Sequence, residues 1–553
     1  MPINYQLSST LLPMSKKYPQ LWPKTSTNNG HPASDVQPPN PAATHWSYMN
    51  NFTAWCRARD VLAGEDAIKQ AGELYLPSLD NQTTDEYQAY KSRALFFNAT
   101  VRTAEAYLGL IFRRAPFIKV PENPRDSLAR KFSSFRSDSD LQGTTFEAYA
   151  KQIVSEVIAV GRACTVIDYA GPSELRPFIV RYPAERVLNW RTRRIGGRTV
   201  LTMVSLEENI SLSNHADALF EAKHQRQIRV LRLVDGQTLL SLWTNPPNTL
   251  NSPIPKSGYG CVVEIYRQTT ETSSASSEKK AAWYLAETLV PSNRGQALPA
   301  IPVIFHGPIH SLPDIQKLPL ADIIAVNLDH YRLDADYKHG MHYTALPTAW
   351  VTGFDRSTEL RIGSSTAWVS DTPGATAGFL EFKGEGLSTF ERAMDRDERL
   401  MAVLGSRLLE GQKKVGEAAA TIELRQSGEN SILSSLASSV SQSLTQVLRW
   451  IYWWNSIDAT PDDVGPDKVL VELNTDFSTK GMDPQELSAV VAAWQAGAIS
   501  RETMTDLFRR GEVLPDGRTT EEELRAISAS DPSTVEHKTS TPSISSPPIQ
   551  GER

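Results

Sequence analysis

The chain has 553 residues, 40% of them hydrophobic, which is enough to bury the cores of several domains. Its formal net charge of −6 argues against a protein that binds nucleic acid tightly by neutralising phosphates. No apolar run reaches the ~18 residues of a membrane span, and the N-terminus lacks the charged start and apolar core of a signal peptide. The three cysteines form no CxxC pair, so we expect neither disulfides nor a zinc site. This cysteine usage predicts a reducing cytoplasmic compartment.

The N-terminal part predicts an extended arm followed by helices. Residues 1–45 are rich in Pro, Ser, Asn and Thr without periodicity, which is typical of an extended arm. Residues 46–77 predict a helix, a glycine turn and a second helix that stops at Pro77. One longer amphipathic helix is expected over 84–113, and another over 146–160.

A β-rich region follows. Short apolar runs bounded by turn residues predict successive strands of a meander, at 164–169, 176–182, 185–190, 199–206, 227–234, 238–244, 261–267 and 281–290. Gly196-Gly197 predicts a hairpin turn between two of them. The most basic spot of the chain flanks this turn, at Arg191, Arg193, Arg194 and Arg198. A solvated hairpin tip is favoured over a phosphate contact, because most charge clusters are simply solvated.

Two helices then flank a small β unit. Residues 318–343 predict a helix with Pro319 in its first turn, and 387–409 a helix whose first half is charged and whose second half is apolar. The stretch between them alternates short apolar runs with Gly, Ser and Pro. The two helices are therefore expected to stand side by side as the legs of one hairpin.

A polar break, 410–417, precedes the longest predicted helix, 418–454. Its apolar residues recur every three or four positions, while its other face is mostly serine, which permits close approach of neighbours. Three tryptophans near its end, Trp450, Trp453 and Trp454, are expected to be buried anchors. Two short helices, 484–496 and 500–510, favour a packed helical hairpin over a DNA-reading helix-turn-helix, because acidic residues interrupt the basic ones. A further short helix is expected at 519–527.

Catalytic signatures are scarce. The sequence contains no GxxxxGK[ST] loop, no GxSxG elbow and no HExxH helix. His330, Asp334 and Asp336 are the best candidates for a divalent-metal site, since His330 and Asp334 share a helix face at i, i+4. His339 and His342 follow on the same helix, and polar groups on a solvated or subunit-facing helix are the favoured explanation. Asp395 and Asp397 lie within a mixed-charge run, where ion pairing explains them better than metal binding.

The order of these elements resembles that of portal proteins of tailed bacteriophages, from Trp55 to Leu514. Four stretches carry the resemblance: WCRARDVLAGEDAIKQAGELYLP with YKSRALFFNATVRTAEAYLGLIFRRAP; LPLADIIAVNLDHYRLDADYKHGMHYTALPTAWVTG; MAVLGSRLLEGQKKVGEAAATIELRQSGENSILSSLASSVSQSLTQVL; and ELNTDFSTKGMDPQELSAVVAAWQAGAISRETMTDLFRRGEVL. It implies an α+β portal fold. The implied parts are a wing (46–317), stem helices (318–344 and 386–409), a β clip (345–385), a tunnel loop (410–417), a long helix returning to the wing (418–482) and a helical crown (483–527). The arm (1–45) and the Ser/Pro-rich tail (528–553), which is expected to be disordered, lie outside the resemblance.

The resemblance also implies a function without catalysis or cofactors. Such proteins form a homo-oligomeric ring, usually a dodecamer, at one capsid vertex, with a channel for double-stranded DNA during packaging and ejection. The implied partners are the major capsid protein, a head–tail adaptor, a scaffolding protein and, transiently, the large terminase subunit. The implied location is the virion, and the host cytoplasm during assembly. Tunnel-loop residues Gln412, Lys413 and Lys414 are the expected sequence-independent DNA contacts, and a merely solvated loop is nearly as well supported. The expected charges between stem subunits are Glu391, Arg392, Arg396, Glu398 and Arg399.

Two alternatives remain. A metal-dependent nuclease or hydrolase would use His330, Asp334 and Asp336. A tail-adaptor ring would be shorter and would lack the order of helix, β unit and helix.

Overall fold

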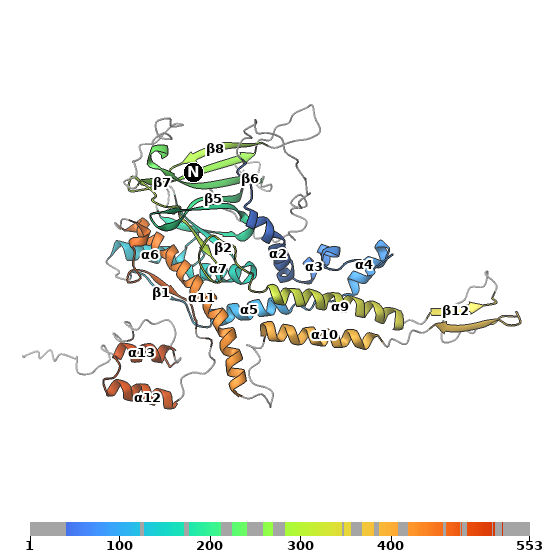
Figure 1. The fold of residues 1–553 in the computed structure, drawn as a ribbon. Helices are drawn as coiled ribbons and strands as arrows, with labels where there is room; N and C mark the ends of the chain where they lie inside the picture. Colours follow the sequence, from blue (N-terminus) through green and yellow to red (C-terminus); the bar gives the residue numbers. More distant parts are fainter. Residues whose placement is uncertain are drawn as a thin grey trace, which may run out of the picture. The chain divides into compact units, whose positions relative to one another are not determined.

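The computed structural model describes residues 40–121, 126–170, 176–211, 224–239, 258–268, 282–345, 348–354, 368–380, 386–406, 419–456, 460–475, 477, 484–510, 513–514 and 523. The chain divides into two compact units, Met1–Thr475 and Asp476–Arg553. Both helices and sheets contribute to the fold, which confirms the expected α+β class (Figure 1). In the part of the chain that the structure describes, no helix is both long and apolar enough to cross a membrane.

The first unit begins with a helical layer made of α2 (Trp46–Ala63), α3 (Glu65–Ala71), the 3-10 turn η1 (Gly72–Leu74), α4 (Thr84–Arg93) and α5 (Ala99–Ile111). The glycine turn predicted near residue 64 is confirmed, since Gly64 has a positive φ of 98°. The single helix expected over 84–113 is wrong. The chain leaves helical geometry at Ala94, whose ψ is 141°, and α5 restarts where Asn98 accepts a hydrogen bond from Val101 N at 3.0 Å.

A three-stranded antiparallel sheet lies at the centre of this unit. Its order is β11 (Val303–His306), β2 (Ala163–Tyr169) and β3 (Pro177–Pro183). Two helices precede it in the chain, α6 (Ser127–Ser137) and α7 (Phe146–Val160), and α7 is buried along most of its length. The left-handed Gly161 ends α7, and an added methyl group there would lie 3.2 Å from the Lys317 carbonyl oxygen.

The other strands of the meander form a separate five-stranded antiparallel sheet (Figure 1). Its strands, in spatial order, are β4 (Val187–Ile195), β5 (Arg198–Ser211), β6 (His224–Asp235), β7 (Tyr259–Gln268) and β8 (Trp283–Leu289). The 3-10 turn η2 (Ala184–Arg186) connects the two sheets. The strand expected over 238–244 is wrong where it is described, because Thr238 and Leu239 are helical; residues 240–244 lie outside the described residues.

Short pairs of strands complete the unit. β1 (Phe117–Lys119), which the sequence analysis missed, pairs with β14 (Leu470–Glu472). β9 (Ser292–Asn293) pairs with β10 (Gln296–Ala297). The end of the predicted arm, residues 40–45, crosses the five-stranded sheet: Ser205 Oγ donates to Pro41 O at 2.7 Å, and Asn189 Nδ2 donates to Ala43 O at 3.0 Å. Residues 1–39 of the arm lie outside the described residues.

The longest helix, α11 (Ala419–Asn455), is buried on most of its circumference from residue 433 onward. Its serine face is in contact with its neighbours. Ser439 Oγ donates to Gly307 O at 2.8 Å, and Leu473 N donates to Ser441 Oγ at 2.9 Å. The expectation that the serines allow close approach is confirmed at these positions. The predicted tryptophan anchors are also confirmed, because all three tryptophans of the helix end are buried. The 3-10 turn η5 (Pro461–Asp463) follows this helix.

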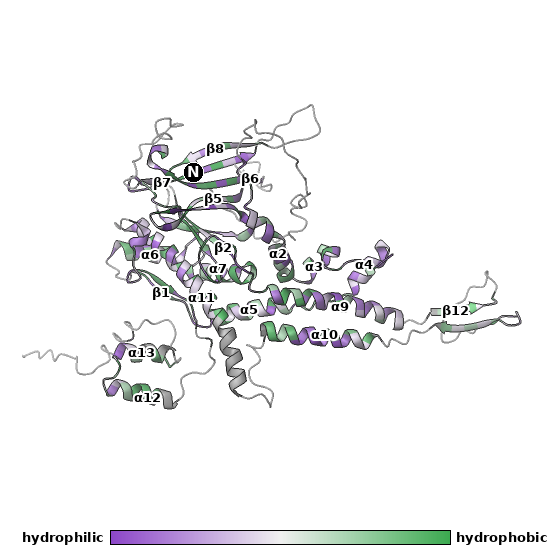
Figure 2. Cartoon of the chain, in the orientation of Figure 1, coloured by the Kyte–Doolittle hydropathy of each residue, from purple (hydrophilic) through white to green (hydrophobic). Residues whose placement is uncertain are grey.

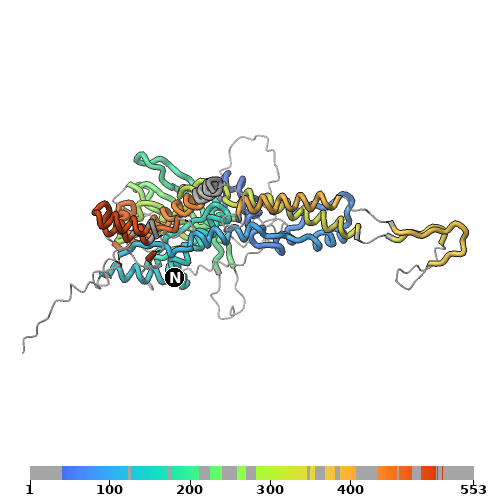
Figure 3. Tube along the Cα trace, turned by 90° about the horizontal axis from the view of Figure 1, so that it is seen from below, coloured from blue at the N-terminus to red at the C-terminus, as the bar shows by residue number. Residues whose placement is uncertain are grey.

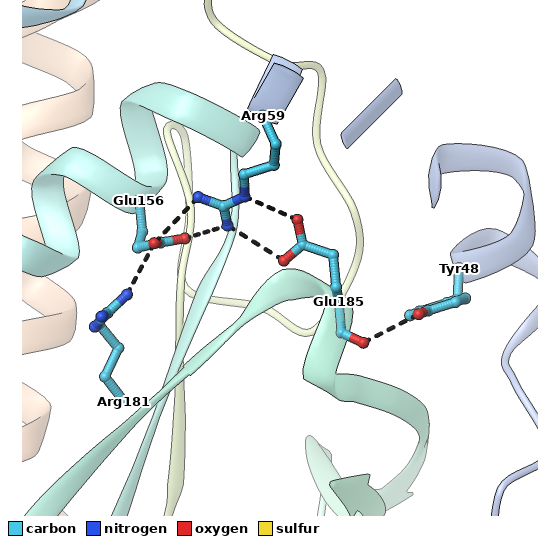
Figure 4. Close-up of polar contacts among 5 residues, drawn as sticks. All are labelled: Tyr48, Arg59, Glu156, Arg181 and Glu185. Atoms are coloured by element: carbon cyan, nitrogen blue, oxygen red, sulfur yellow. Dashed lines mark hydrogen bonds and ion pairs between the residues drawn. The ribbon is translucent and has the colours of Figure 1, made fainter. Parts of the chain in front are cut away.

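A buried ionic network fixes α2 against the sheet layer (Figure 4). Arg59 Nη2 lies 2.6 Å from Glu156 Oε2 on α7, and Arg59 Nε lies 2.9 Å from Glu185 Oε1 on η2. Arg181 Nη1 on β3 reaches the same Glu156 at 2.8 Å. Burial alone would raise the pKa of Glu156, but the Arg59 and Arg181 guanidinium groups outweigh it and hold that pKa below its usual range. Glu156, whose side chain is only 13% exposed, is therefore held in the charged state by its two arginines.

A second buried chain of polar groups joins α7, the central sheet and α11. Tyr149 Oη and His306 Nε2 each lie 2.7 Å from Thr165 Oγ1, and His306 Nδ1 lies 2.7 Å from Ser443 Oγ. Burial lowers the pKa of His306 to about 3. The imidazole is therefore neutral in the folded protein at ordinary pH.

The second unit contains α12 (Pro484–Gln495) and α13 (Arg501–Arg510), which pack against each other. This confirms the predicted helical hairpin. Ser500 caps α13, since Thr503 N donates to Ser500 Oγ at 3.0 Å. The helix predicted at 519–527 lies outside the described residues except for Glu523, and the tail 528–553 lies wholly outside them.

Replacing Arg59 with Met should lower the free energy of unfolding by about 3–5 kcal/mol, because two buried carboxylates lose a cationic partner. Urea denaturation measures this change. Arg57→Met, on an exposed position of the same helix, is the matched control and should change stability by less than about 0.5 kcal/mol. Equal losses in the two variants would contradict a dominant role for the network.

Acid should destabilise the fold through His306. A histidine in the unfolded chain takes up a proton below its ordinary pKa of 6.5, whereas burial lowers the pKa of the folded imidazole to about 3. The stabilisation by neutral His306 is therefore complete above pH 6.5. As the pH falls from 6.5 towards 3, the free energy of unfolding decreases by about 1.4 kcal/mol per pH unit. We expect His306→Gln to be less stable than the parent at pH 7 and the difference to narrow by about 2 kcal/mol at pH 5. His224→Gln, at an exposed histidine, should leave the pH profile unchanged.

Candidate functional site: the paired helices α9 and α10

Two antiparallel helices carry most of the residues that the sequence analysis singled out. They are α9 (Ala321–Ala345) and α10 (Leu387–Met401), and α10 continues into a π-helical turn, η4 (Ala402–Ser406). The helices lie side by side in both views (Figures 1 and 3). The prediction that they form the legs of one hairpin is confirmed, with bounds that differ from the expected ones by a few residues.

Contacts that share one register hold the two helices together along their length. Near its far end, a methyl group added to Gly340 would lie 2.9 Å from Leu387 Cδ2. One turn further along, Tyr337 Oη donates to Glu391 Oε1 at 2.7 Å. Close approach at the glycine and a direct hydrogen bond at the tyrosine therefore fix the distal half.

The proximal half follows the same register. His330 Nε2 lies 3.5 Å from Glu398 Oε1. An added methyl group at Gly405 would lie 2.7 Å from Ile323 Cδ1 and 2.2 Å from Thr103 Oγ1 of α5. Only the absence of a side chain at Gly405 lets η4 contact both α9 and α5. Neither glycine could be assigned this role from sequence, because their partners are distant in the chain.

The helical layer of α4 and α5 occupies another side of α9. Asn327 bridges the break between these helices: Thr100 Oγ1 donates to Asn327 Oδ1 at 2.9 Å, and Asn327 Nδ2 donates to Phe97 O at 2.7 Å. Leu95 N donates to Asp334 Oδ2 at 2.6 Å. These side chains satisfy backbone groups that the interruption of the helix leaves open.

The candidate metal residues are engaged in these contacts. Asp334 also binds Lys338 Nζ at 3.1 Å, and Asp336 accepts a hydrogen bond from Tyr90 Oη at 2.5 Å. His330 is buried and faces Glu398, while His342 Nε2 lies 3.1 Å from Arg93 Nη2. His339 has its ring against Tyr90. Among the described residues, no three His, Cys, Asp or Glu side chains could hold one metal ion. These polar groups dock α9 onto the α4–α5 layer.

The five charged residues expected between subunits are all exposed on α10, where Figure 2 shows hydrophilic bands. Glu391 and Glu398 contact α9 as described above. Arg392 Nε donates to its own helix at Ser388 O, 3.1 Å away, and Arg396 reaches Asp397 at 3.3 Å. Arg399 has no ion-pair or hydrogen-bond partner among the described residues. The expected contacts to other subunits remain a prediction.

The charged and apolar halves of this helix would be expected to be solvated and packed respectively, but burial does not follow that division. In the charged half, Asp397 is buried, at 2% exposure, and its Oδ2 has no hydrogen-bond partner within the described structure. In the apolar half, Met401 and Gly405 are buried, but Leu400, Val403 and Leu404 are 37–42% exposed. The reason is geometric: α9 and α5 cover only one side of α10 and η4. An apolar stripe therefore faces outward within this single chain.

The β unit between the helices is a two-stranded antiparallel hairpin of β12 (Thr348–Thr352) and β13 (Thr376–Leu380). The ring of Trp350 lies over Gly378, where an added methyl group would be 3.0 Å from the indole Nε1. Trp350 and Phe379 remain 45% and 53% exposed. An isolated two-stranded hairpin is marginally stable in water, so this one gains from a neighbour.

The tunnel-loop residues Gln412, Lys413 and Lys414 lie outside the described residues, as does the rest of 407–418. The structure places the end of η4 before this segment and the start of α11 after it.

Comparisons with known proteins concern this region and the whole chain. A family model described as a domain of unknown function (DUF4055) matches residues 319–455, which begin just before α9 and end with α11. No curated protein matches the chain. The chain is similar to a chain in the neck of an empty gene transfer agent particle computed with C6 symmetry. The identity is 10%, the TM-score is 0.35, and the match covers 76% of this chain and 91% of that one.

Two further solved structures are similar at 9% identity, over 82% of this chain and 100% of theirs. They are the virion of a native gene transfer agent particle, with a TM-score of 0.35, and the neck of a native particle computed with C12 symmetry, with a TM-score of 0.34. A likeness of this strength does not assign a function.

Gly405→Ala should destabilise the junction of η4, α5 and α9 by about 1–3 kcal/mol, because the new methyl group overlaps Thr103 and Ile323. Thermal unfolding measures the loss. Gly109→Ala on α5 is the matched control: nothing lies within 4 Å of the added methyl group, so the greater helix propensity of alanine should raise stability by up to about 1 kcal/mol. A neutral Gly405 variant would show that the junction is not tightly packed.

Proposed function

We propose that this chain is the portal protein of a tailed bacteriophage or a related particle. It would form a homo-oligomeric ring, with twelve subunits as the expected number, at one vertex of the capsid. Its axial channel would pass double-stranded DNA inward during packaging and outward during ejection. In this proposal the chain has no catalytic activity of its own.

The observation that supports this most is the unit formed by α9, the β12–β13 hairpin and α10. Two helices in one continuous register enter and leave a small β hairpin, and a helix of 37 residues follows in the chain. This is the order of stem, clip, stem and long helix that the sequence resemblance implies. The hairpin would then be the docking surface for the terminase motor and later for the head–tail adaptor.

The surface of this unit suits a subunit within a ring. α10 packs mainly against α9, so its other faces carry exposed charges together with the outward stripe of Leu400, Val403 and Leu404. The hairpin adds two exposed aromatic rings, Trp350 and Phe379. A neighbouring copy that covers these faces would bury the apolar groups and pair the charges.

Charge is also compatible with a conduit. Each subunit carries −6, so a ring would repel DNA overall and let it move. Local cations would still touch the phosphate backbone, and Lys413 and Lys414 in the proposed tunnel loop are the ones expected to do so.

Reversing two exposed charges of α10, Arg396→Glu with Arg399→Glu, should block ring formation and leave the monomer folded, because like charges would meet at the proposed interface. Negative-stain imaging and mass photometry report closed rings, and circular dichroism reports the fold. Arg130→Glu with Lys131→Glu on α6, which changes the net charge equally, should leave the rings intact. A parent protein that stays monomeric and cleaves DNA with Mg²⁺ or Mn²⁺ would overturn the proposal.

Lys413→Ala with Lys414→Ala should leave rings intact and alter DNA packaging or retention, because removing the two cations weakens a transient phosphate contact. Packaging is measured as nuclease-protected DNA in assembled particles. Failure of the rings themselves to assemble would show that these lysines stabilise the ring and do not line the channel.

A further inference from the structure

The basic hairpin of the five-stranded sheet is not explained by the proposed ring. It joins β4 to β5 through Gly196 and Gly197, whose φ angles of 57° and 82° are those of a type I′ turn. Nothing lies within 4 Å of a methyl group added to either glycine. The glycines are needed for their backbone conformation, and the turn is surrounded by open space.

Three arginines on this hairpin are not neutralised. Arg191, Arg193 and Arg194 are exposed, and their guanidinium groups have no ion-pair or hydrogen-bond partner in the part of the chain that the structure describes. The fourth arginine, Arg198, lies 3.4 Å from Asp462, and both side chains are about 80% exposed. Three unpaired positive charges therefore gather on one strand of a chain whose net charge is −6.

The strand that carries them is at the edge of its sheet. The sheet order starts at β4, so among the described residues no strand pairs with its outer side. Side chains alternate between the two faces of a strand, and a register shift interrupts the ladder between Arg191 and Thr192. Arg193 and Arg194 consequently point to opposite faces, and the positive charge surrounds the ribbon.

A hollow of about 460 Å³ adjoins the base of this strand. Trp46, Trp190 and Arg191 are among the residues that line it. The Trp190 ring is held in place, with His45 at 4.1 Å between ring centroids and the Arg162 guanidinium at 3.9 Å from its centroid. Trp46 is 72% exposed. A rigid aromatic wall and a largely exposed indole, whose ring centroid lies 5.6 Å from that of His45, thus lie next to the basic strand.

The hollow itself is not a phosphate site. Asp314 also lines it, and its carboxylate would repel an anion there. Phosphates are better placed on the arginines of the hairpin, and an uncharged planar group is better placed beside Trp46. Cations that follow a backbone next to an exposed aromatic ring are the combination that binds nucleic acid without reading its sequence.

We propose that the β4–β5 hairpin binds the phosphodiester backbone of nucleic acid. Arg191, Arg193 and Arg194 contact the phosphates of a duplex or a single strand, and Trp46 stacks on an unpaired base where one is present. Every residue involved belongs to one chain, so the contact needs no neighbouring subunit, and none of these residues belongs to the tunnel loop.

The test is fluorescence anisotropy of the full chain with a labelled duplex and with a labelled single strand over a range of NaCl concentrations. Replacing the three arginines with Gln should weaken binding at least tenfold at low salt. It should also reduce the slope of log K against log salt by about 2.7 for a duplex and about 2.1 for a single strand. Replacement with Lys should retain binding, because phosphate contacts need the charge and not the guanidinium shape. Trp46→Ala should weaken binding of the single strand alone.

The matched control removes three exposed cations elsewhere, by Arg130→Gln, Lys131→Gln and Lys151→Gln on α6 and α7. This control should bind like the parent, and equal weakening would overturn the proposal by showing a net-charge effect. The proposal is also overturned if the Gln variant binds as tightly as the parent. It is overturned as well if polyglutamate displaces the duplex when the two are present at equal concentrations of negative charge, because the surface would then be one for an acidic protein. The Lys413→Ala/Lys414→Ala protein, measured in parallel, separates this contact from the tunnel loop.

Discussion

The first unit depends on the close approach of α11 to the elements around it. Serine and threonine side chains on this helix are short enough to let strands and loops lie directly against its backbone, and they donate or accept hydrogen bonds there. Thr445 Oγ1 accepts from Val471 N at 2.9 Å, next to the bond from Leu473 N to Ser441 Oγ. β14 is thereby hydrogen-bonded to a helix on one side and to β1 on another. Larger side chains at these positions would move the strand away and leave its amides unpaired.

The elements that sequence predicted best are those whose own periodicity determines them. The apolar repeat of α11 and the short apolar runs of most sheet strands are local properties, and the structure confirms them. The Ser500 cap and the Gly196-Gly197 turn are likewise local, since each depends on one or two residues with particular backbone preferences. The α+β class follows from these elements alone.

What sequence could not provide depends on residues far apart in the chain. The break between α4 and α5 is stabilised by Asn327, which lies 227 positions from the Thr100 it contacts. The same cause hides the partners of His330 and Asp334, which the sequence analysis placed on a solvated or subunit-facing helix in preference to a metal site. Their i, i+4 spacing permits a metal, but their surroundings supply Glu398 and the Leu95 amide instead. An asparagine within the apolar start of α9 was the available signal, because a buried amide needs partners.

The four contacts that share one register along α9 and α10 have a mechanical consequence. The helices approach closely at a glycine near each end of the pair, and two polar contacts lie between these glycines. Together these contacts prevent the helices from sliding past each other, so the pair moves as one stiff rod. The rod ends in the π-helical turn Ala402–Ser406, where Gly405 packs against both Ile323 of α9 and Thr103 of α5. A push on the distal end of the pair is therefore carried to η4 and to α5 beside it, at the last described residues before the segment that leads into α11.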